Sequence, residues 1–222
     1  MCIRDRYLIK ARDNHHDGII TNLRIKDFFL NYEAYTRDFT ISFGTGTLTY
    51  HNTHKESDWK VTLTDTGIRS MTGSRISRIR DYVGNEDFML TYGDGVSDVN
   101  IDELLKFHKS HGKILSVTGV RPPGRFGEMV SDEKGKVIAF NEKPQASAGR
   151  ISGGFFVASP KIFDYLNDSE DLVFEQEPIH NLVNDKQLMM FEHDGFWQPM
   201  DTSREYLLLN SLYEKGEAPW IK

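Results

Sequence analysis

The stretch Phe88-Met-Leu-Thr-Tyr-Gly-Asp94-Gly-Val-Ser-Asp98 decides how this chain is interpreted. It begins as an apolar run and ends abruptly in small and acidic residues, as a buried strand of a parallel sheet does at its carboxyl end. Ligands of open α/β sheets bind just outside that end, so we expect Asp94, flanked by Gly93 and Gly95, to face a phosphate and a divalent cation. Carboxylate oxygens suit Mg²⁺, which usually takes one or two carboxylates plus substrate phosphates. A tight hairpin turn at Asp94-Gly95 is the alternative, because Asp-Gly is a favoured turn pair.

A helix and a second strand follow this stretch. An apolar stripe at helical spacing runs from Ile101 to His108, and a further apolar run spans Ile114–Val120. Strand, helix and strand at this spacing form a βαβ unit, whose crossover is nearly always right-handed. The chain therefore has the pattern of an α/β protein.

The remaining pattern predicts one domain. We expect helices over residues 25–32, 74–83, 161–166, 175–183 and 202–213, and strands over 39–43, 47–50, 59–64, 137–140, 155–158 and 188–191, the first two of these strands as a hairpin. Residues 23–222 are thus predicted to be a single domain with a Rossmann-like mixed, mostly parallel sheet. Residues 1–22 show no periodic pattern and are expected to be an irregular or foreign lead-in.

The amino-acid composition argues against nucleic acid and membranes as binding partners. The 222 residues carry a formal net charge of -6 with scattered Lys and Arg, which argues against the clustered basic footprint of a nucleic-acid-binding protein. No apolar run is long enough to span a bilayer, so we expect no membrane partner. Cys2 is the single cysteine, so an internal disulfide is impossible and a reducing, cytoplasmic setting is expected.

Two loops of small residues could approach an anion. In Met71-Thr-Gly-Ser-Arg75, main-chain N–H groups at the start of a helix favour an anion or a polar base edge. An ordinary helix cap at Thr72 or Ser74 is the alternative. In Ser152-Gly-Gly-Phe-Phe156, paired glycines entering a strand indicate either close approach of a ligand or a bulge without one.

Two further segments carry charged side chains that could act in the same site. Glu142 and Lys143 follow a predicted strand, where the carboxylate could hold sugar hydroxyls and the ammonium a phosphate oxygen, although a surface pair of this kind is common. Asp201 precedes the last predicted helix, so it is either a helix cap or a second carboxylate on the cation of Asp94. Trp197 is most simply a core aromatic residue.

Taken in order, these segments resemble the glucose-1-phosphate cytidylyltransferase family of sugar nucleotidyltransferases. The resemblance covers the chain from about Lys26 to the C-terminus. It is carried by Trp59-Lys-Val-Thr-Leu-Thr-Asp-Thr-Gly67, Ser70-Met-Thr-Gly-Ser-Arg75, Tyr92-Gly-Asp-Gly-Val-Ser-Asp98, Pro122-Pro-Gly-Arg-Phe-Gly127, Glu142-Lys-Pro144, Gly153-Gly-Phe-Phe156, Asp194-Gly-Phe-Trp197 and Pro199-Met-Asp-Thr202. The Pro-Pro-Gly-Arg-Phe-Gly and Gly-Phe-Trp motifs distinguish this family from its uridylyl and thymidylyl relatives.

The resemblance implies the fold of the sugar nucleotidyltransferases and transfer of a cytidylyl group from CTP to α-D-glucose 1-phosphate. The products would be CDP-glucose and pyrophosphate, feeding dideoxysugar synthesis for surface polysaccharides such as O-antigen. The sugar phosphate would attack the α-phosphorus in line without a protein nucleophile, so catalysis would rest on positioning and charge neutralisation. A homo-oligomer is the implied assembly.

The resemblance also assigns roles to individual residues. Asp94 and Asp201 would hold Mg²⁺ between them and would be catalytic together with Lys143. Thr72, Gly73, Arg75 and Gly93 would bind the nucleotide, and Glu142, Lys143, Gly154 and Trp197 would bind the sugar phosphate.

The chain departs from the family pattern in three places. A Gly-Gly-Leu-Gly-Thr-Arg-like loop, which cradles the triphosphate in the family, is not found, and we expect the first βαβ portion to be lacking. Ser152 and Ser74 stand where the family usually has asparagine and glycine. The activity of the chain as given is therefore in question, and two alternatives stay open: a non-catalytic sugar-nucleotide-binding fragment and a metal-dependent glycosyltransferase.

Overall fold

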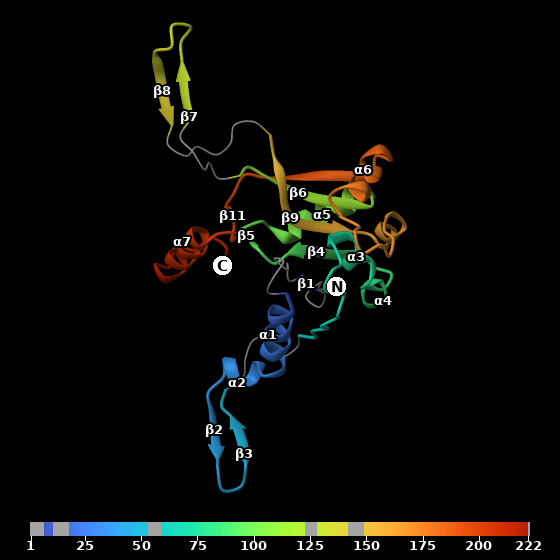
Figure 1. Cartoon of the computed structure of the whole chain (residues 1–222), viewed down its shortest axis with the longest axis vertical. Coiled ribbons are helices and arrows are strands. Elements are labelled where there is room, and N and C mark those ends of the chain that lie inside the picture. Colours follow the sequence, from blue (N-terminus) through green and yellow to red (C-terminus); the bar gives the residue numbers. More distant parts are fainter. Residues whose placement is uncertain (1–6, 11–17, 53–58, 123–127, 142–148, 222) are drawn as a thin grey trace.

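A mixed five-stranded sheet forms the centre of the molecule, with strand order β1-β4-β9-β6-β10 (Figure 1). The structure, a computed structural model, describes residues 7–10, 18–52, 59–122, 128–141 and 149–221. The strands of the central sheet are β1 (Tyr7–Lys10), β4 (Phe88–Tyr92), β6 (Leu115–Val120), β9 (Ile151–Ala158) and β10 (Leu188–His193).

Strand direction divides this sheet into two parallel pairs around one reversed strand. β1 runs parallel to β4, and β10 runs parallel to β6. β9 lies between the two pairs and is antiparallel to both β4 and β6. The prediction of a mixed, mostly parallel sheet is therefore confirmed. The predicted βαβ unit is present as β4, α5 (Ile101–His111) and β6, but β9 occupies the position between its two strands.

The helices and the apolar faces of the sheet enclose one core. The helices beside the sheet are α3 (Thr72–Ser77), α4 (Arg80–Val83), α5, α6 (Glu177–Asn184) and the 3-10 helix η1 (Pro160–Tyr165). α5 begins at an Asn100 cap that accepts the N–H of Glu103, and ends at Gly112 in the left-handed region. The core cluster consists of Ile76, Ile79, Val83, Phe88, Leu90, Leu115, Phe156, Ala158, Ile162, Phe163, Phe174 and Leu182.

Two hairpins project from opposite ends of the molecule (Figure 1). One is formed by β2 (Phe39–Ser42) and β3 (Thr47–Tyr50), and α1 (Gly18–Leu30) and α2 (Tyr32–Thr36) join it to the rest of the chain. The other is formed by β7 (Glu128–Ser131) and β8 (Val137–Asn141). A small ladder of β5 (Gly95–Ser97) and β11 (Trp197–Pro199) lies beside the sheet and leads into α7 (Ser203–Glu214).

Within the stretch expected to be an irregular or foreign lead-in, the structure describes residues 7–10 and 18–22, and both segments have regular structure. Tyr7–Lys10 pairs in register with Met89–Tyr92 as an edge strand, and α1 begins at Gly18. A strand of four residues shows no measurable period, and its pairing partner lies about eighty residues away in the chain, so the local pattern could not reveal it.

Two other expected elements differ in the structure. Residues 59–64 were expected to form a strand but join no ladder. The helix expected over residues 74–83 is divided into α3 and α4 by Arg78 and Ile79. Among the described helices, none combines the length and the apolar character needed to cross a membrane.

Candidate active site

The β5–β11 ladder brings the segments of Asp94 and Asp201 together. The two strands pair antiparallel with Gly95 opposite Pro199. At the end of this ladder, the N–H of Met200 donates to the carbonyl oxygen of Asp94 at 2.7 Å. The two acidic residues therefore lie on adjoining chain segments, at the carboxyl end of β4 where the sequence predicted the site.

The alternative of a tight hairpin turn at Asp94-Gly95 is wrong. β4 pairs with β1 and β9, whereas β5, on the other side of the turn, pairs with β11. The turn therefore redirects the chain out of the central sheet toward the segment that carries Asp201.

Asp201 is not the cap of the last helix. That cap is Thr202, whose hydroxyl oxygen accepts the N–H of Glu205 at 3.3 Å. The Glu205 carboxylate accepts the N–H groups of Asp201 and Thr202 at 2.9 Å each, which completes a capping box. Helix capping thus accounts for Thr202 and Glu205 and leaves the carboxylate of Asp201 available for another role.

This pair of carboxylates suits magnesium better than a metal held by protein alone. Within the described parts of the chain, no group of three or more His, Cys, Asp or Glu side chains converges as metal ligands do. Mg²⁺ retains waters and commonly takes one or two carboxylates plus substrate phosphates. The donor set of Asp94 and Asp201 therefore fits Mg²⁺, which stays a prediction.

The paired glycines and Trp197 also meet at this edge of the sheet. The indole Nε1–H of Trp197 donates to the carbonyl oxygen of Gly153 at 2.9 Å. Trp197 is half-buried, so it is a bridge between β11 and β9 rather than a core residue. Gly154 has φ +78°, and an added Cβ would lie 3.1 Å from Cδ2 of Tyr92. Gly154 and Trp197, both predicted beside the sugar, are thus brought into one region with Tyr92.

The start of α3 differs from what the sequence suggested. The N–H groups of Gly73 and Ser74 both donate to the carbonyl oxygen of Leu172, at 2.8 and 3.2 Å. The expectation of free main-chain donors at this helix start is therefore wrong, because the segment before Phe174 occupies them. The cap position is Met71, and it makes no side-chain cap hydrogen bond, so capping by Thr72 or Ser74 is wrong as well. A nucleotide role for Thr72 and Gly73 stays a prediction.

Glu175 joins the start of α3 to the end of β4. Its carboxylate accepts the hydroxyl of Thr72 at 2.7 Å and the hydroxyl of Tyr92 through its other oxygen. The Thr72 hydroxyl oxygen also accepts the N–H of Phe174 at 2.7 Å. Sequence reasoning did not find Glu175, which was assigned only to the start of a helix. The residue fixes the spacing between two segments that were both predicted to bind the nucleotide.

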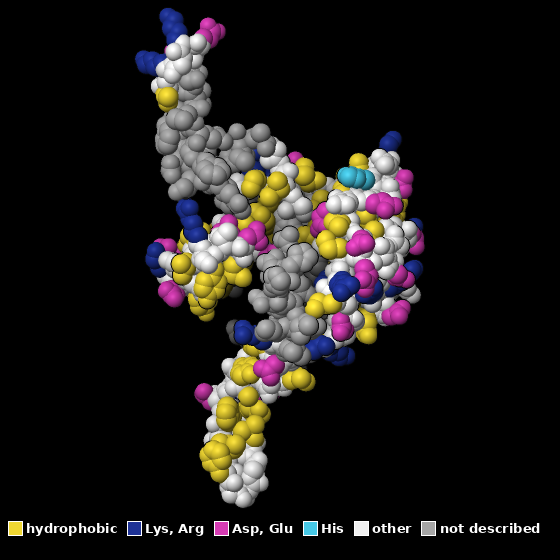
Figure 2. Space-filling view, viewed as in Figure 1, with side chains coloured by type: hydrophobic (Ala, Val, Ile, Leu, Met, Phe, Trp, Pro, Cys, Tyr) yellow, Lys and Arg dark blue, Asp and Glu magenta, His cyan; other side chains and the backbone are white. Residues whose placement is uncertain are grey.

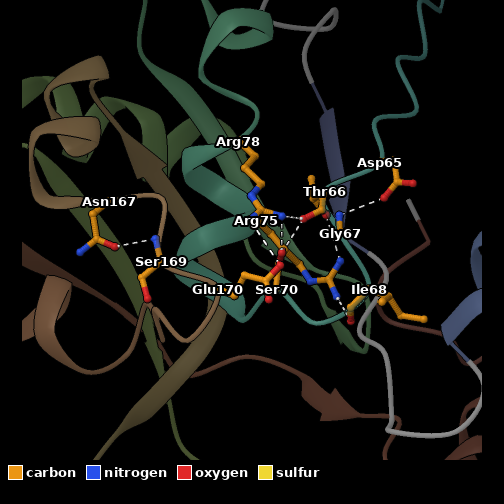
Figure 3. Close-up of polar contacts among 10 residues, drawn as sticks. All are labelled: Asp65, Thr66, Gly67, Ile68, Ser70, Arg75, Arg78, Asn167, Ser169 and Glu170. Atoms are coloured by element: carbon orange, nitrogen blue, oxygen red, sulfur yellow. Dashed lines mark hydrogen bonds and ion pairs between the residues drawn. The ribbon is translucent and has the colours of Figure 1, made fainter.

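Arg75 and Arg78 hold the loop of residues 65–70 (Figure 3). Arg78 donates to the Thr66 carbonyl at 2.7 Å and to the Ser70 hydroxyl at 2.6 Å. Arg75 donates to the Thr66 hydroxyl at 2.9 Å and to the Ile68 carbonyl at 3.4 Å. Any contact of Arg75 with a triphosphate, as the resemblance implies, would have to coexist with or replace these bonds.

A nearly buried arginine organises the carboxyl ends of β6 and β10. The side chain of Arg150 is 8% exposed and donates to the carbonyl oxygens of Gly119 and His193. It also pairs with Glu192 and Asp194 at 2.9 Å each. Hydrogen bonds from Arg121 and Arg150 lower the pKa of the Asp194 carboxyl. Sequence reasoning missed this group, although an arginine directly before a glycine-bearing strand is the signal that could have indicated it.

Ser97, Asp98 and His193 lie close together but do not form a proton relay. His193 Nε2 lies 3.0 Å from an Asp98 carboxylate oxygen and 3.3 Å from the Ser97 hydroxyl. A nucleophile–base–acid relay needs the serine and the carboxylate on different ring nitrogens. Because both contact Nε2, this trio supports the turn of residues 193–196 and does not suggest acyl chemistry.

The remaining predicted residues divide into two groups. Gly93 is exposed beside Asp94, and its role in nucleotide binding stays a prediction. Glu142 and Lys143 lie outside the described residues, so their predicted contacts with a sugar phosphate stay predictions.

Comparisons with known proteins agree on the family. The sequence profile of the family described as Nucleotidyl transferase matches residues 50–216. A glucose-1-phosphate cytidylyltransferase from Salmonella typhi is 45% identical over 197 residues, covering 88% of this chain and 76% of the relative. A Bacillus subtilis protein assigned the same activity is 38% identical over 197 residues, covering 89% of this chain and 76% of the relative.

A solved structure supports the fold independently of close sequence similarity. It is a protein from Bacillus anthracis assigned as a glucose-1-phosphate thymidylyltransferase, in complex with sucrose, and it superimposes with a TM-score of 0.52 at 19% identity. The match covers 69% of this chain and 64% of that chain, so this chain spans slightly less than two thirds of its length.

Proposed function

The chain belongs to the nucleotidyl transferase family, and from this premise we propose that it transfers a cytidylyl group from CTP to α-D-glucose 1-phosphate. The choice of sugar phosphate and nucleotide is supported by two relatives whose names give glucose-1-phosphate cytidylyltransferase, at 45% and 38% identity. The observation that carries the proposal is the 2.7 Å hydrogen bond between Met200 and Asp94, which holds the segments of the two acidic residues together.

The proposed reaction needs positioning more than covalent help from the protein. A phosphate oxygen of glucose 1-phosphate forms a bond to the α-phosphorus of CTP while the bond from that phosphorus to the bridging oxygen breaks. Pyrophosphate leaves with the electron pair, and CDP-glucose remains. Mg²⁺, when held by Asp94 and Asp201, would neutralise phosphate charge. The protein orients the two substrates in line and keeps their charged groups at a fixed separation.

The described residues support a division of labour within this site. Consecutive hydrogen bonds from Tyr92 and Thr72 to Glu175 hold together the side of the site proposed to bind the nucleotide. Trp197 and the Gly153–Gly154 pair form the proposed sugar side, where the glycines let the main chain pack closely against Val120 and Tyr92. Lys143 and Glu142 complete the proposal as ligands of the sugar phosphate.

A homo-oligomer is part of the proposal, supported by apolar surface on the projecting hairpin. Phe43, in the turn directly after β2, is 91% exposed, and Leu30, at the end of α1, is 83% exposed. Figure 2 shows hydrophobic side chains gathered along this projection and over α7. Contiguous exposed apolar surface commonly marks a protein interface. Light scattering coupled to gel filtration would report the mass, and a monomer at all concentrations would contradict an oligomer.

A binding-only role is the second candidate, favoured by one observation. The N–H groups of Gly73 and Ser74, which would otherwise be available to an anion, are bonded to the Leu172 carbonyl. Under this alternative, calorimetry would detect binding of CDP-glucose while no turnover occurs. A metal-dependent glycosyltransferase, by contrast, would transfer sugar without releasing pyrophosphate from CTP.

The test of the proposed function is pyrophosphate release from CTP and glucose 1-phosphate, with and without Mg²⁺. Asp94→Asn and Asp201→Asn should each lower kcat/KM by about 10²-fold or more, because each removes the charge of one of the two proposed Mg²⁺ ligands. Asp102→Asn, an exposed carboxylate on the first turn of α5, is the matched control and should leave the rate unchanged. Full activity of either site variant would remove that carboxylate from the proposal, and faster turnover with UTP than with CTP would reject the cytidylyl assignment.

A further inference from the structure

A pocket lies at the end of the sheet opposite to Asp94. Its volume is about 490 Å³, within the range of small-molecule sites. Three residues that line it come immediately before strands of the sheet: Asp87 before β4, Ile114 before β6 and Gln187 before β10. Because these three strands run in the same direction, their amino ends share one edge of the sheet, and Asp94 follows β4 at the other edge. We refer to the hollow around His108, Lys109, Lys113 and Lys161 as the basal pocket.

Three lysine residues and two acidic residues, Asp87 and Asp185, line the basal pocket, and the lysines are not ion-paired with either acid. Lys109 comes from the last turn of α5, Lys113 from the loop before β6, and Lys161 from η1. Over the part of the chain that the structure describes, none of the ion pairs within 4 Å involves these three lysines. One pocket carboxylate, Asp185, instead accepts the hydroxyl of Tyr165 at 2.8 Å.

The wall of the pocket contains the buried imidazole of His108, and the surrounding hydrogen bonds determine which of its ring nitrogens carries the proton. The main-chain N–H of Lys113 donates to Nδ1 of His111 at 2.9 Å, so that nitrogen carries no proton. His111 Nε2 must then carry the proton and donate to the Ser116 hydroxyl oxygen at 2.8 Å. The Ser116 hydroxyl hydrogen is left for Nδ1 of His108, also at 2.8 Å. His108 therefore carries its own proton on Nε2, the one polar ring atom outside this chain of bonds.

With this order of donors and acceptors, the Nε2–H of His108 is a hydrogen-bond donor in the pocket wall. His108 is 2% exposed and Ser116 is fully buried, so the chain of bonds has a fixed geometry. Burial is the largest cause that lowers the pKa of both histidines. For His108 the Asp87 carboxylate opposes this lowering while His111 and Lys109 add to it, and for His111 the Lys113 charge adds to it. Both rings are accordingly neutral near pH 7, which agrees with the proton order obtained from the hydrogen bonds.

We propose that the basal pocket binds the phosphate group of a small phosphorylated molecule, with Lys109, Lys113 and Lys161 supplying charge and His108 Nε2–H supplying a directional hydrogen bond. Ammonium groups and an N–H donor are the groups that recognise phosphate oxygens in proteins. The site is separate from the Asp94 region and does not depend on the proposed nucleotidyl transfer. The shared chemistry is the phosphate group, whether it comes as inorganic phosphate or as a phosphate ester.

The experiment is a titration of the full chain with inorganic phosphate at constant ionic strength, followed through the assigned ring signals of His108 by NMR. We expect a saturable shift that chloride does not produce. Lys109→Gln and Lys113→Gln should each weaken phosphate binding about two- to five-fold, as the loss of one solvent-accessible ion pair does. Lys106→Gln is the matched control, because Lys106 is also an exposed lysine of α5 but does not line the pocket. The affinity of this variant for phosphate should equal that of the unmodified chain.

Ribose 5-phosphate, titrated in the same way, distinguishes the two sources of the phosphate. Tighter binding of the ester than of inorganic phosphate would assign the pocket to a phosphorylated metabolite, and equal binding would assign it to phosphate alone. The proposal is overturned if phosphate causes no saturable shift at His108, if chloride causes the same shift, or if Lys106→Gln weakens binding as much as the two pocket variants.

Discussion

Replacing Gly154 by alanine tests whether the glycine pair is shaped by the fold around the candidate active site. The residue has φ +78°, a region in which an L side chain crowds its own backbone. Its added Cβ would also lie 3.1 Å from a ring carbon of Tyr92. That ring has little freedom to withdraw, because its hydroxyl is bonded to Glu175 and the ring packs against Phe156 in an edge-to-face arrangement with 5.6 Å between the centroids.

Substitutions at two other glycines separate the two causes by which Gly154→Ala should lower the free energy of unfolding, namely backbone strain and crowding of the added Cβ. Gly112 has φ +63° with open space around an added Cβ, so Gly112→Ala should lose only the backbone term, about 1–2 kcal/mol. At Gly153 the φ is ordinary, but a Cβ would lie 2.7 Å from a methyl of Val120, so crowding alone should destabilise by about 1–3 kcal/mol. Gly154→Ala combines both causes, and we expect a loss of about 2–4 kcal/mol.

The assay is urea-induced unfolding of the four proteins, followed by far-UV circular dichroism and tryptophan fluorescence. Coincident transitions in both signals would justify a two-state free energy of unfolding for each variant. If Gly154→Ala loses no more stability than Gly112→Ala, then Tyr92 yields to the added methyl group. In that case the reasoning that Glu175 and Phe156 hold the ring in place is refuted.

Three further predictions concern groups away from the glycines. The free energy of unfolding should fall as pH drops below 6.5, the ordinary pKa of histidine, because burial lowers the pKa of His108 and only the unfolded chain then takes up the proton. The slope from this one group is at most about 1.4 kcal/mol per pH unit. Denaturant titrations that give a constant free energy of unfolding between pH 6.5 and pH 5 would contradict this prediction. Arg150→Met should destabilise by about 2–3 kcal/mol, since two main-chain carbonyls lose their donor, whereas Arg121→Met, at a more exposed partner of Asp194, should change the urea midpoint much less. Thr72→Val keeps the side-chain shape but removes the acceptor of a main-chain N–H and the bond to Glu175, so we expect a loss of about 1–3 kcal/mol in the same assay; an unchanged midpoint would show that this link contributes nothing.

Local sequence patterns were sufficient for elements whose signal lies within one segment. The apolar run that ends at Tyr92 is a buried strand, and the small acidic turn after it lies at the carboxyl end, as the pattern predicted. The helix predicted over residues 202–213 is observed as Ser203–Glu214, although its cap is Thr202 and not Asp201. The α5 helix was predicted for the same reason, with acidic residues in its first turn and a glycine after its last.

Local sequence patterns could not predict features that depend on contacts between segments far apart in the chain. β5 and β11 are three residues each, too short to show a period, and their pairing joins positions about one hundred residues apart. Glu175 occupies an exposed position and looks like any other acid before a helix, so only the folded chain shows it between Thr72 and Tyr92. β1 could not be predicted for the same reason, because it is recognised as a strand only through its pairing with β4.

The direction of β9 explains why the glycine pair belongs to the same region as Asp94. A simple alternation of strands and helices would make β9 parallel to its neighbours and would place Gly153 and Gly154, near its start, at the amino edge of the sheet. β9 is instead antiparallel to β4 and β6, so its start lies at the carboxyl edge beside Trp197, and its end leads to Lys161 of the basal pocket. One reversed strand thus reaches both the candidate active site and the basal pocket. Substitutions at its two ends should therefore affect the two sites separately, provided that the strand between them keeps its register.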